Sequence, residues 1–138
     1  MCEKQKMLSG EIYNAYDKDL VLLRNKARHL TKLYNNTDPE DVTNRINILK
    51  KLFGKIGNNF EIEPPFHCDY GTNIHIGETF YANFNFLVLD DGLVTIGDNV
   101  LIAPNVSIFT ATHLLDPKLR PKNADYTKAV TKIGRAHV

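Results

Sequence analysis

A six-residue repeat in the second half of the chain constrains the fold more than any other feature. Apolar pairs separated by one residue begin at positions 60 and 66, at 74, 80 and 86, and at 94, 100 and 106, with two-residue slips at Tyr70 to Asn73 and Asp90 to Leu93. The pairs are Phe60 and Ile62, Phe66 and Cys68, Ile74 and Ile76, Phe80 and Ala82, Phe86 and Val88, Val94 and Ile96, Val100 and Ile102, and Val106 and Ile108. Six residues are too few for a strand, a loop and a return within one sheet, but they fit one flat side of a three-sided coil. The repeat therefore predicts a parallel β-helix, since a sandwich or barrel needs hairpin turns at wider spacing.

The first part of the chain has a helical period instead. Apolar residues recur at three- and four-residue steps from Leu20 to Tyr34, which predicts an amphipathic helix. We expect a second helix from Asp38, as its cap, to Phe53, with Asn35 and Asn36 joining the two into a hairpin. A shorter helical turn is predicted at Leu8 to Tyr13. The chain thus divides into a helical segment, 1–57, and a repeat region, 58–138, with an irregular loop at 110–128.

Composition narrows the class of protein. The chain has 138 residues, 43% of them hydrophobic, and its 17 Lys and Arg nearly balance its 16 Asp and Glu. Such a balance is untypical of disordered chains and of nucleic-acid binders, so we expect neither nucleic acid nor membrane as a partner. No apolar run approaches the roughly 20 residues of a membrane span, and residues 1–6 lack the apolar core of a signal peptide. With Cys2 and Cys68 expected to be reduced, the sequence predicts a cytoplasmic protein.

Several longer runs resemble the maltose and galactoside O-acetyltransferase group of hexapeptide-repeat acyltransferases. The runs are Met7-Leu-Ser-Gly-Glu-Ile-Tyr13, Cys68-Asp-Tyr-Gly71, Asn73-Ile-His-Ile-Gly77, Phe80-Tyr-Ala-Asn-Phe-Asn85, Ile96-Gly-Asp-Asn-Val100, Thr110-Ala-Thr-His113 and Asp116-Pro117, in the group's order across Met7 to Val130. The resemblance implies a mainly β fold, a left-handed parallel β-helix of hexapeptide repeats with a short N-terminal α-helical segment. It also implies acetyl-CoA as donor, a mono- or disaccharide as acceptor, no metal, and a homotrimer with sites between subunits.

His113 is the candidate catalytic base. A sugar hydroxyl is a poor nucleophile until its proton is being removed, and imidazole titrates near pH 6.5. Among the five histidines, only His113 follows directly on the regular repeat at the start of the irregular loop. The plainer alternative is a loop histidine that caps a turn. In the group that this sequence resembles, the histidine of the Thr-Ala-Thr-His run is the catalytic base.

Five further residues are candidates for binding the sugar. The resemblance implies Asp69, Asn83 and Asp91, because related enzymes hold the acceptor with polar residues there, and carboxylates and amides suit vicinal hydroxyls. Asp69 and Asp91 also precede glycines at the two slips, so a turn-forming role is open as well. Tyr81 either stacks on a sugar ring or packs between subunits. Asp17 resembles an N-terminal acidic residue that reaches the sugar site in some relatives.

Other features have less specific interpretations. His67 and His75 have two interpretations. They could be zinc ligands, as in a zinc-binding β-helix enzyme, or simply histidines exposed on strands. Cys68 occupies an inward position, where a small thiol packs well. A loose basic stretch either is a solvated loop or attracts the phosphates of coenzyme A; it comprises Lys118, Arg120, Lys122, Lys128 and Lys132. The residues that bind acetyl-CoA are not identified by the sequence.

The C-terminal residues depart from the repeat. The start of a further coil is expected at 128–131, but residues 132–138 do not continue the hexads. Because members of the group continue with further coils, we expect a C-terminally truncated chain. A non-catalytic, oligomerising fragment that keeps the sugar-side residues is therefore the alternative to an active enzyme.

Overall fold

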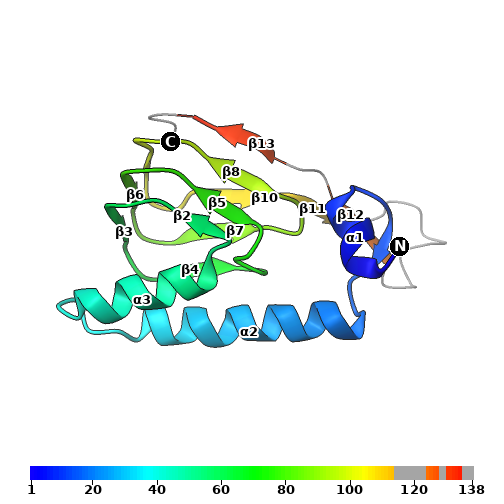
Figure 1. Ribbon diagram of the computed structural model, residues 1–138, viewed down its shortest axis with the longest axis horizontal. Helices are drawn as coiled ribbons and strands as arrows, with labels where there is room; N and C mark the ends of the chain where they lie inside the picture. Colours follow the sequence, from blue (N-terminus) through cyan, green and yellow to red (C-terminus); the bar gives the residue numbers. More distant parts are fainter. Residues whose placement is uncertain (114–123, 128–129, 135–138) are drawn as a thin grey trace.

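The computed structural model describes residues 1–113, 124–127 and 130–134. The helices are α1 (Glu3–Leu8), α2 (Lys18–Asn35) and α3 (Val42–Leu52). The strands are β1 (Tyr13–Asn14), β2 (Lys55–Ile56), β3 (Phe60–Ile62), β4 (Phe66–Cys68), β5 (Ile74–Ile76), β6 (Phe80–Ala82), β7 (Phe86–Leu89), β8 (Val94–Ile96), β9 (Leu101–Ile102), β10 (Ser107–Phe109), β11 (Ala111–His113), β12 (Ala124–Thr127) and β13 (Val130–Ile133). Figure 1 shows α2 and α3 beneath a stack of short strands, with β13 at the far end.

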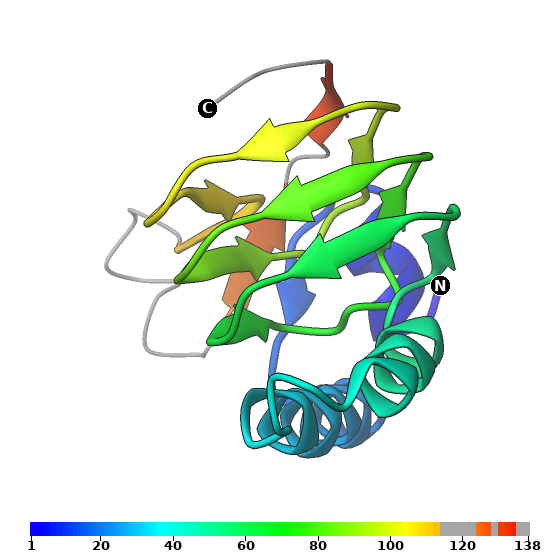
Figure 2. The ribbon, with the colours of Figure 1, turned by 90° about the vertical axis from the view of Figure 1, so that its left-hand side faces the viewer.

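The strands from β2 to β10 wind into a three-sided coil. Its sides are three parallel sheets with the strand orders β2-β5-β8-β13, β3-β6-β9 and β4-β7-β10. Phe60 pairs with Phe80 and Ile74 with Val94, so one turn takes 20 residues, or three hexads and one two-residue slip. Figure 2 shows the successive turns stacked on one another. The predicted parallel β-helix is confirmed, and it begins at β2, slightly before the first hexad of the sequence pattern.

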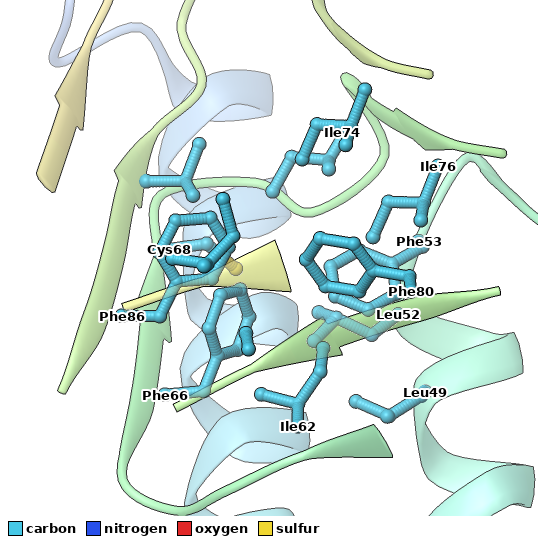
Figure 3. Packing of buried hydrophobic residues seen from close by; sticks show 14 of the residues in the cluster. Leu49, Leu52, Phe53, Ile62, Phe66, Cys68, Ile74, Ile76, Phe80 and Phe86 are labelled. Atoms are coloured by element: carbon cyan, nitrogen blue, oxygen red, sulfur yellow. The ribbon is translucent and has the colours of Figure 1, made fainter. Parts of the chain in front are cut away.

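The core is a column of side chains that the repeat directs inward. Ile62, Phe66, Ile74 and Val94 are each fully buried. Aromatic rings stack between turns, with centroids 5.7 Å apart for Phe66 and Phe86 (Figure 3). Because every second residue of each strand enters this column, a shift of one residue would expose the apolar set, and the register is therefore strongly fixed.

The corners of the coil need a backbone conformation that few residues adopt. Five corner residues have positive φ angles between 55° and 63°: Asn59, Thr79, Asn85, Asn99 and Asn105. Asparagine tolerates this left-handed region better than most residues, which explains its recurrence in the hexads. Nδ2 of Asn85 also donates to Oδ1 of Asn105, one turn further on, at 3.0 Å.

The helical hairpin covers the open end of the first turn. The Tyr34 hydroxyl on α2 donates to the carbonyl of Ile62 at 2.5 Å. Asn35 donates to the carbonyl of Phe66 and accepts from its amide, both at 2.9 Å. These bonds satisfy backbone groups on the rim of the coil that would otherwise be unpaired.

Two local expectations for the N-terminal segment are wrong. Helix α3 begins at Val42 rather than after Asp38, because Asp38 caps a separate turn by accepting from the amide of Glu40. The helical turn expected at Leu8 to Tyr13 is instead the end of α1, a turn at Gly10 with φ 78°, and strand β1. Strand β1 pairs with β12, more than a hundred residues later, so no local pattern could indicate it.

Among the described residues, no helix combines the length and apolar character that crossing a membrane requires.

Replacing Phe66 with alanine tests the importance of the stacked column. We expect Phe66→Ala to lower the free energy of unfolding by about 3–5 kcal/mol, because it empties the space between Phe53 and Phe86. The measurement is urea unfolding followed by circular dichroism. Phe84→Ala is the matched control, because that ring is 51% exposed, and should change stability by only about 0.5 kcal/mol. Equal effects of the two substitutions would contradict the packing described here.

Candidate active site

Three irregular segments stack on one edge of the coil. Strands β4, β7 and β10 lie side by side, with Cys68 paired to Val88 and Phe109 to Leu89. The residues that follow these strands therefore leave the sheet at the same edge. They are the two slips of the repeat and the start of the irregular loop at Thr110, so the sequence irregularities coincide in space.

The side chain of Asp90 holds the backbone of the neighbouring slip in place at this edge. Its side chain is fully buried, and Oδ1 accepts from the amides of Asp69 at 3.1 Å and Tyr70 at 2.9 Å. Oδ2 accepts from the amide of Asn73 at 3.3 Å, and Nδ2 of Asn73 donates to the Asp90 carbonyl at 2.8 Å. Burial raises the pKa of Asp90 to about 7, although the backbone donors partly oppose this rise. Apart from its place at a slip, nothing in the sequence marks Asp90 as a functional residue.

Asp91, the next residue, has a different environment. Only 8% of it is exposed, and its Oδ2 accepts from the hydroxyl of Tyr13 at 3.0 Å. Its Oδ1 is buried, and no hydrogen-bond partner for it is found among the described residues. Burial raises the pKa of Asp91 to about 8, and the neighbouring carboxyl of Asp69 adds to the rise. Asp69 and Asp91 are thus brought together, as the acceptor-site prediction requires.

Asp69 is held from the helical hairpin. Nη2 of Arg28 on α2 lies 3.3 Å from Oδ1 of Asp69, and Nη1 donates to the Cys68 carbonyl at 2.7 Å. Next to it, Nη1 of Arg24 donates to the hydroxyl of Tyr70 at 2.8 Å. The helical period of Leu20 to Tyr34 does not indicate these two arginines, because contacts with residues 40 or more positions away have no local signature.

The backbone of His113 leaves the same edge. The hydroxyl of Thr110 donates to the Leu89 carbonyl at 2.6 Å and accepts from the Gly92 amide at 2.8 Å, which fixes the start of the loop beside Asp91. Strand β11 then pairs with β12, His113 opposite Asp125, and β12 pairs with β1, Tyr13 opposite Asp125. A small antiparallel sheet, in the order β1-β12-β11, thus connects the strand of His113 with the N-terminal segment. Figure 1 shows β11 and β12 next to α1.

Tyr81 and Asn83 lie on another side of the coil. Tyr81 is on β6, where it pairs with Glu61, and Asn83 follows that strand with its Oδ1 accepting from the Phe84 amide at 2.8 Å. Burial and the charges of Glu63 and Glu61 raise the pKa of Tyr81. The whole of β7, four residues at about 3.3 Å each, separates this corner from Asp91, or about 13 Å. A single chain does not bring Asn83 and Asp91 together.

Asp17 begins helix α2. Its Oδ2 accepts from the amides of Asp19 at 3.1 Å and Leu20 at 3.4 Å, so it has a capping role. Leu20 packs with Tyr13 and Tyr70, which places the start of α2 beside the N-terminal segment of the site.

The remaining candidates have plainer environments. His67 on β4 is exposed and His75 on β5 is half-buried, and these strands belong to different sheets. No group of three metal-ligating side chains occurs within the part of the chain that the structure describes. Cys68 is buried in the core as predicted, and burial raises the pKa of its thiol. Of the basic stretch, Lys118, Arg120, Lys122 and Lys128 lie outside the described residues, as does the loop at 114–123.

Comparison with solved structures identifies the fold. The chain superposes on a maltose O-acetyltransferase from Clostridium difficile 630 with a TM-score of 0.91 and 46% identity, over 94% of this chain and 69% of that one. It superposes on a galactoside acetyltransferase in complex with coenzyme A with a TM-score of 0.90 and 34% identity, over 98% of this chain and 73% of that one. The left-handed parallel β-helix that the resemblance implied is confirmed.

Sequence comparison agrees with this result. The maltose acetyltransferase hexapeptide capping motif matches residues 6–57. The galactoside O-acetyltransferase of Escherichia coli (strain K12) is 38% identical over 127 residues, which are 92% of this chain and 63% of that protein. The chain therefore spans somewhat under two thirds of that relative. By sequence and by structure, it belongs to the maltose and galactoside O-acetyltransferase family of hexapeptide-repeat proteins.

Proposed function

We propose that the chain acts in a sugar O-acetyltransferase that moves the acetyl group of acetyl-CoA to a hydroxyl of a mono- or disaccharide. The observation that carries the proposal is the meeting of Asp69, Asp91 and the strand of His113 at one edge of the coil. That edge combines hydrogen-bond acceptors for a sugar with the residue best suited to remove a proton. Membership of the family named above supports acetyl-CoA as the donor and a sugar as the acceptor.

In the proposed reaction, His113 is the general base. Its imidazole takes the proton of the acceptor hydroxyl while the hydroxyl oxygen attacks the thioester carbonyl carbon. A carbon–oxygen bond forms, the carbon–sulfur bond breaks, and the departing thiolate of coenzyme A takes the proton from the imidazolium. The products are the acetylated sugar and free coenzyme A, so atoms and charge balance without a metal ion.

The acceptor is held by carboxylates and an amide in this proposal. In the ionised form of Asp91, the buried Oδ1, which has no donor among the described residues, is suited to accept from a sugar hydroxyl. Asp69 beside it offers a second acceptor, and Asp17 lies at the start of the neighbouring helix. Paired acceptors of this kind orient one hydroxyl toward the base and so favour one position of the ring for acetylation.

A homotrimer is part of the proposal. Asn83 and Tyr81 are about 13 Å or more from Asp91 within one chain, along the four residues of β7, which is too far to hold one sugar ring together. A neighbouring copy related by threefold symmetry would present its Asn83 corner to the Asp91 edge. The acceptor site would then be complete only between copies, and we expect this assembly in the cytoplasm.

A second candidate is a non-catalytic oligomerising fragment. The chain spans 63% of the length of the Escherichia coli relative. Such a fragment would bind sugars at the Asp91 edge but would not turn over acetyl-CoA. Thioester consumption with a panel of sugars separates the two candidates, because only the enzyme consumes acetyl-CoA in proportion to acceptor.

Removing the proposed base is the direct test of the reaction. We expect His113→Ala to lower kcat by about 10²–10⁴-fold with little change in the acceptor KM, because the imidazole acts on the proton in transit rather than on binding. Release of coenzyme A is followed with a thiol reagent. His67→Ala, which alters an exposed histidine on β4, is the matched control and should retain wild-type turnover. Undiminished turnover in His113→Ala would remove this residue from its role.

Mixing two inactive variants tests the site between subunits. Asn83→Ala and His113→Ala should each be strongly impaired alone. Co-refolding them in equal amounts should restore about a quarter of wild-type turnover, because one site in four would draw both intact residues from different copies. A mixture no more active than its components would contradict a shared site. A mixture of His113→Ala with His113→Gln controls for any effect of refolding itself.

A further inference from the structure

Tyr13 has a buried hydroxyl in the middle of the candidate site. It is only 2% exposed, on the two-residue strand β1, and its ring packs against Met7, Leu20 and Tyr70. Its hydroxyl donates to Oδ2 of Asp91 at 3.0 Å, although the two residues are 78 positions apart. In the sequence, Tyr13 stands out only as the last residue of the run from Met7.

This bond makes the two oxygens of Asp91 unequal. Oδ2 accepts from the Tyr13 hydroxyl, whereas Oδ1 is buried with no donor among the residues that the structure describes. The carboxyl of Asp69 is the polar group beside Asp91 on this edge. A carboxylate held at one oxygen cannot rotate freely about its last torsion, so the direction of the other oxygen is fixed. A buried acceptor without a donor costs stability, which favours a role in binding over a purely structural one.

The backbone of Tyr13 is also tied to the strand of the proposed base. Tyr13 and His113 both pair with Asp125, from opposite sides of β12. Two strand spacings separate their backbones, about 10 Å in total. Tyr13 thus makes two connections. Its side chain hydrogen-bonds to the carboxylate of Asp91, and its backbone is linked through β12 to the strand of His113.

We propose that Tyr13 is a positioning residue: it holds Asp91 through Oδ2 so that Oδ1 faces an acceptor hydroxyl, in fixed relation to the strand of His113. This role rests on the proposed function. A tyrosine that merely anchors the N-terminal segment would contribute stability but would leave acceptor binding unchanged.

The charges around Asp91 give the proposal a pH signature. Asp91 faces Tyr13 from β1 and Asp69 after β4, and it follows Asp90 on its own turn; Arg28 of α2 reaches the group through Asp69. The two neighbouring carboxyls favour the protonated form of Asp91, while the Tyr13 hydroxyl favours the ionised form. Loss of that hydroxyl should therefore raise the pKa of Asp91 further and move acceptor binding to higher pH.

Tyr13→Phe tests this role, because it removes the hydroxyl and keeps the packed ring. We expect the acceptor kcat/KM to fall about tenfold, mainly through KM, with an unchanged KM for acetyl-CoA. The acid limb of the pH profile of the acceptor kcat/KM should shift to higher pH. Tyr34→Phe is the matched control: it also deletes a buried hydroxyl, bonded to the Ile62 carbonyl, but away from this edge. It should lower stability without changing either acceptor parameter.

A second readout does not depend on turnover. Carbon-13 NMR of the aspartate carboxyls, with Asp91→Asn to assign the resonance, should show the Asp91 titration midpoint rising in Tyr13→Phe and unchanged in Tyr34→Phe. An active wild type whose Tyr13→Phe variant keeps both the acceptor KM and the midpoint overturns the role of Tyr13 alone. A wild type that acetylates none of the sugars overturns the proposed function, and the acceptor role of Tyr13 with it.

Discussion

Stacking of inward apolar side chains in strict register is the constraint on which the rest of the structure depends. Each turn between β2 and β10 takes 20 residues, so Phe60 lies beside Phe80 and Ile74 beside Val94. This register decides more than the core. Because the turns between β2 and β10 have the same length, departures from the hexads that are one turn apart lie next to each other. The two slips and the start of the loop at Thr110 therefore form a single edge.

Two adjacent aspartates at that edge have different roles because their environments differ. Asp90 accepts three backbone amide hydrogens and holds the turn from Asp69 to Asn73. Asp91 accepts one hydroxyl, from Tyr13, and keeps one buried oxygen without a donor among the described residues. Burial raises the pKa of both carboxyls. Only the second has an oxygen without a donor, and in the ionised form of Asp91 that oxygen can accept from a ligand without the loss of a native hydrogen bond.

The repeat predicts the coil closely, because a two-residue alternation with fixed spacing leaves few other ways to bury Phe66 and Val94. The N-terminal segment is predicted less well. Asp38 and Pro39 satisfy the usual signals of a helix start, but they form a separate turn before α3 begins. Strand β1 exists because of its pairing with β12, a contact between ends of the chain that no local pattern contains. For the same reason, no local pattern indicates that its residue Tyr13 contacts Asp91.

The resemblance implies Asp69 and Asp91 as site residues, and both also lie at irregularities of the repeat. Residues that contact these two from other elements have no such signal in the sequence. Arg28 reaches Asp69 from a helix 41 positions away, and Tyr13 reaches Asp91 across 78 positions. A helical or strand period reports which side chains face the core, but it does not report which polar groups meet when separate elements pack. Within this fold, the edge is therefore set by the repeat, whereas the orientation of its carboxylates is set by the N-terminal segment. Under the proposed function, the helical hairpin and β1 then have a second role besides covering the first turn. The coil determines where the acceptor carboxylates lie, and the N-terminal segment determines how they are oriented.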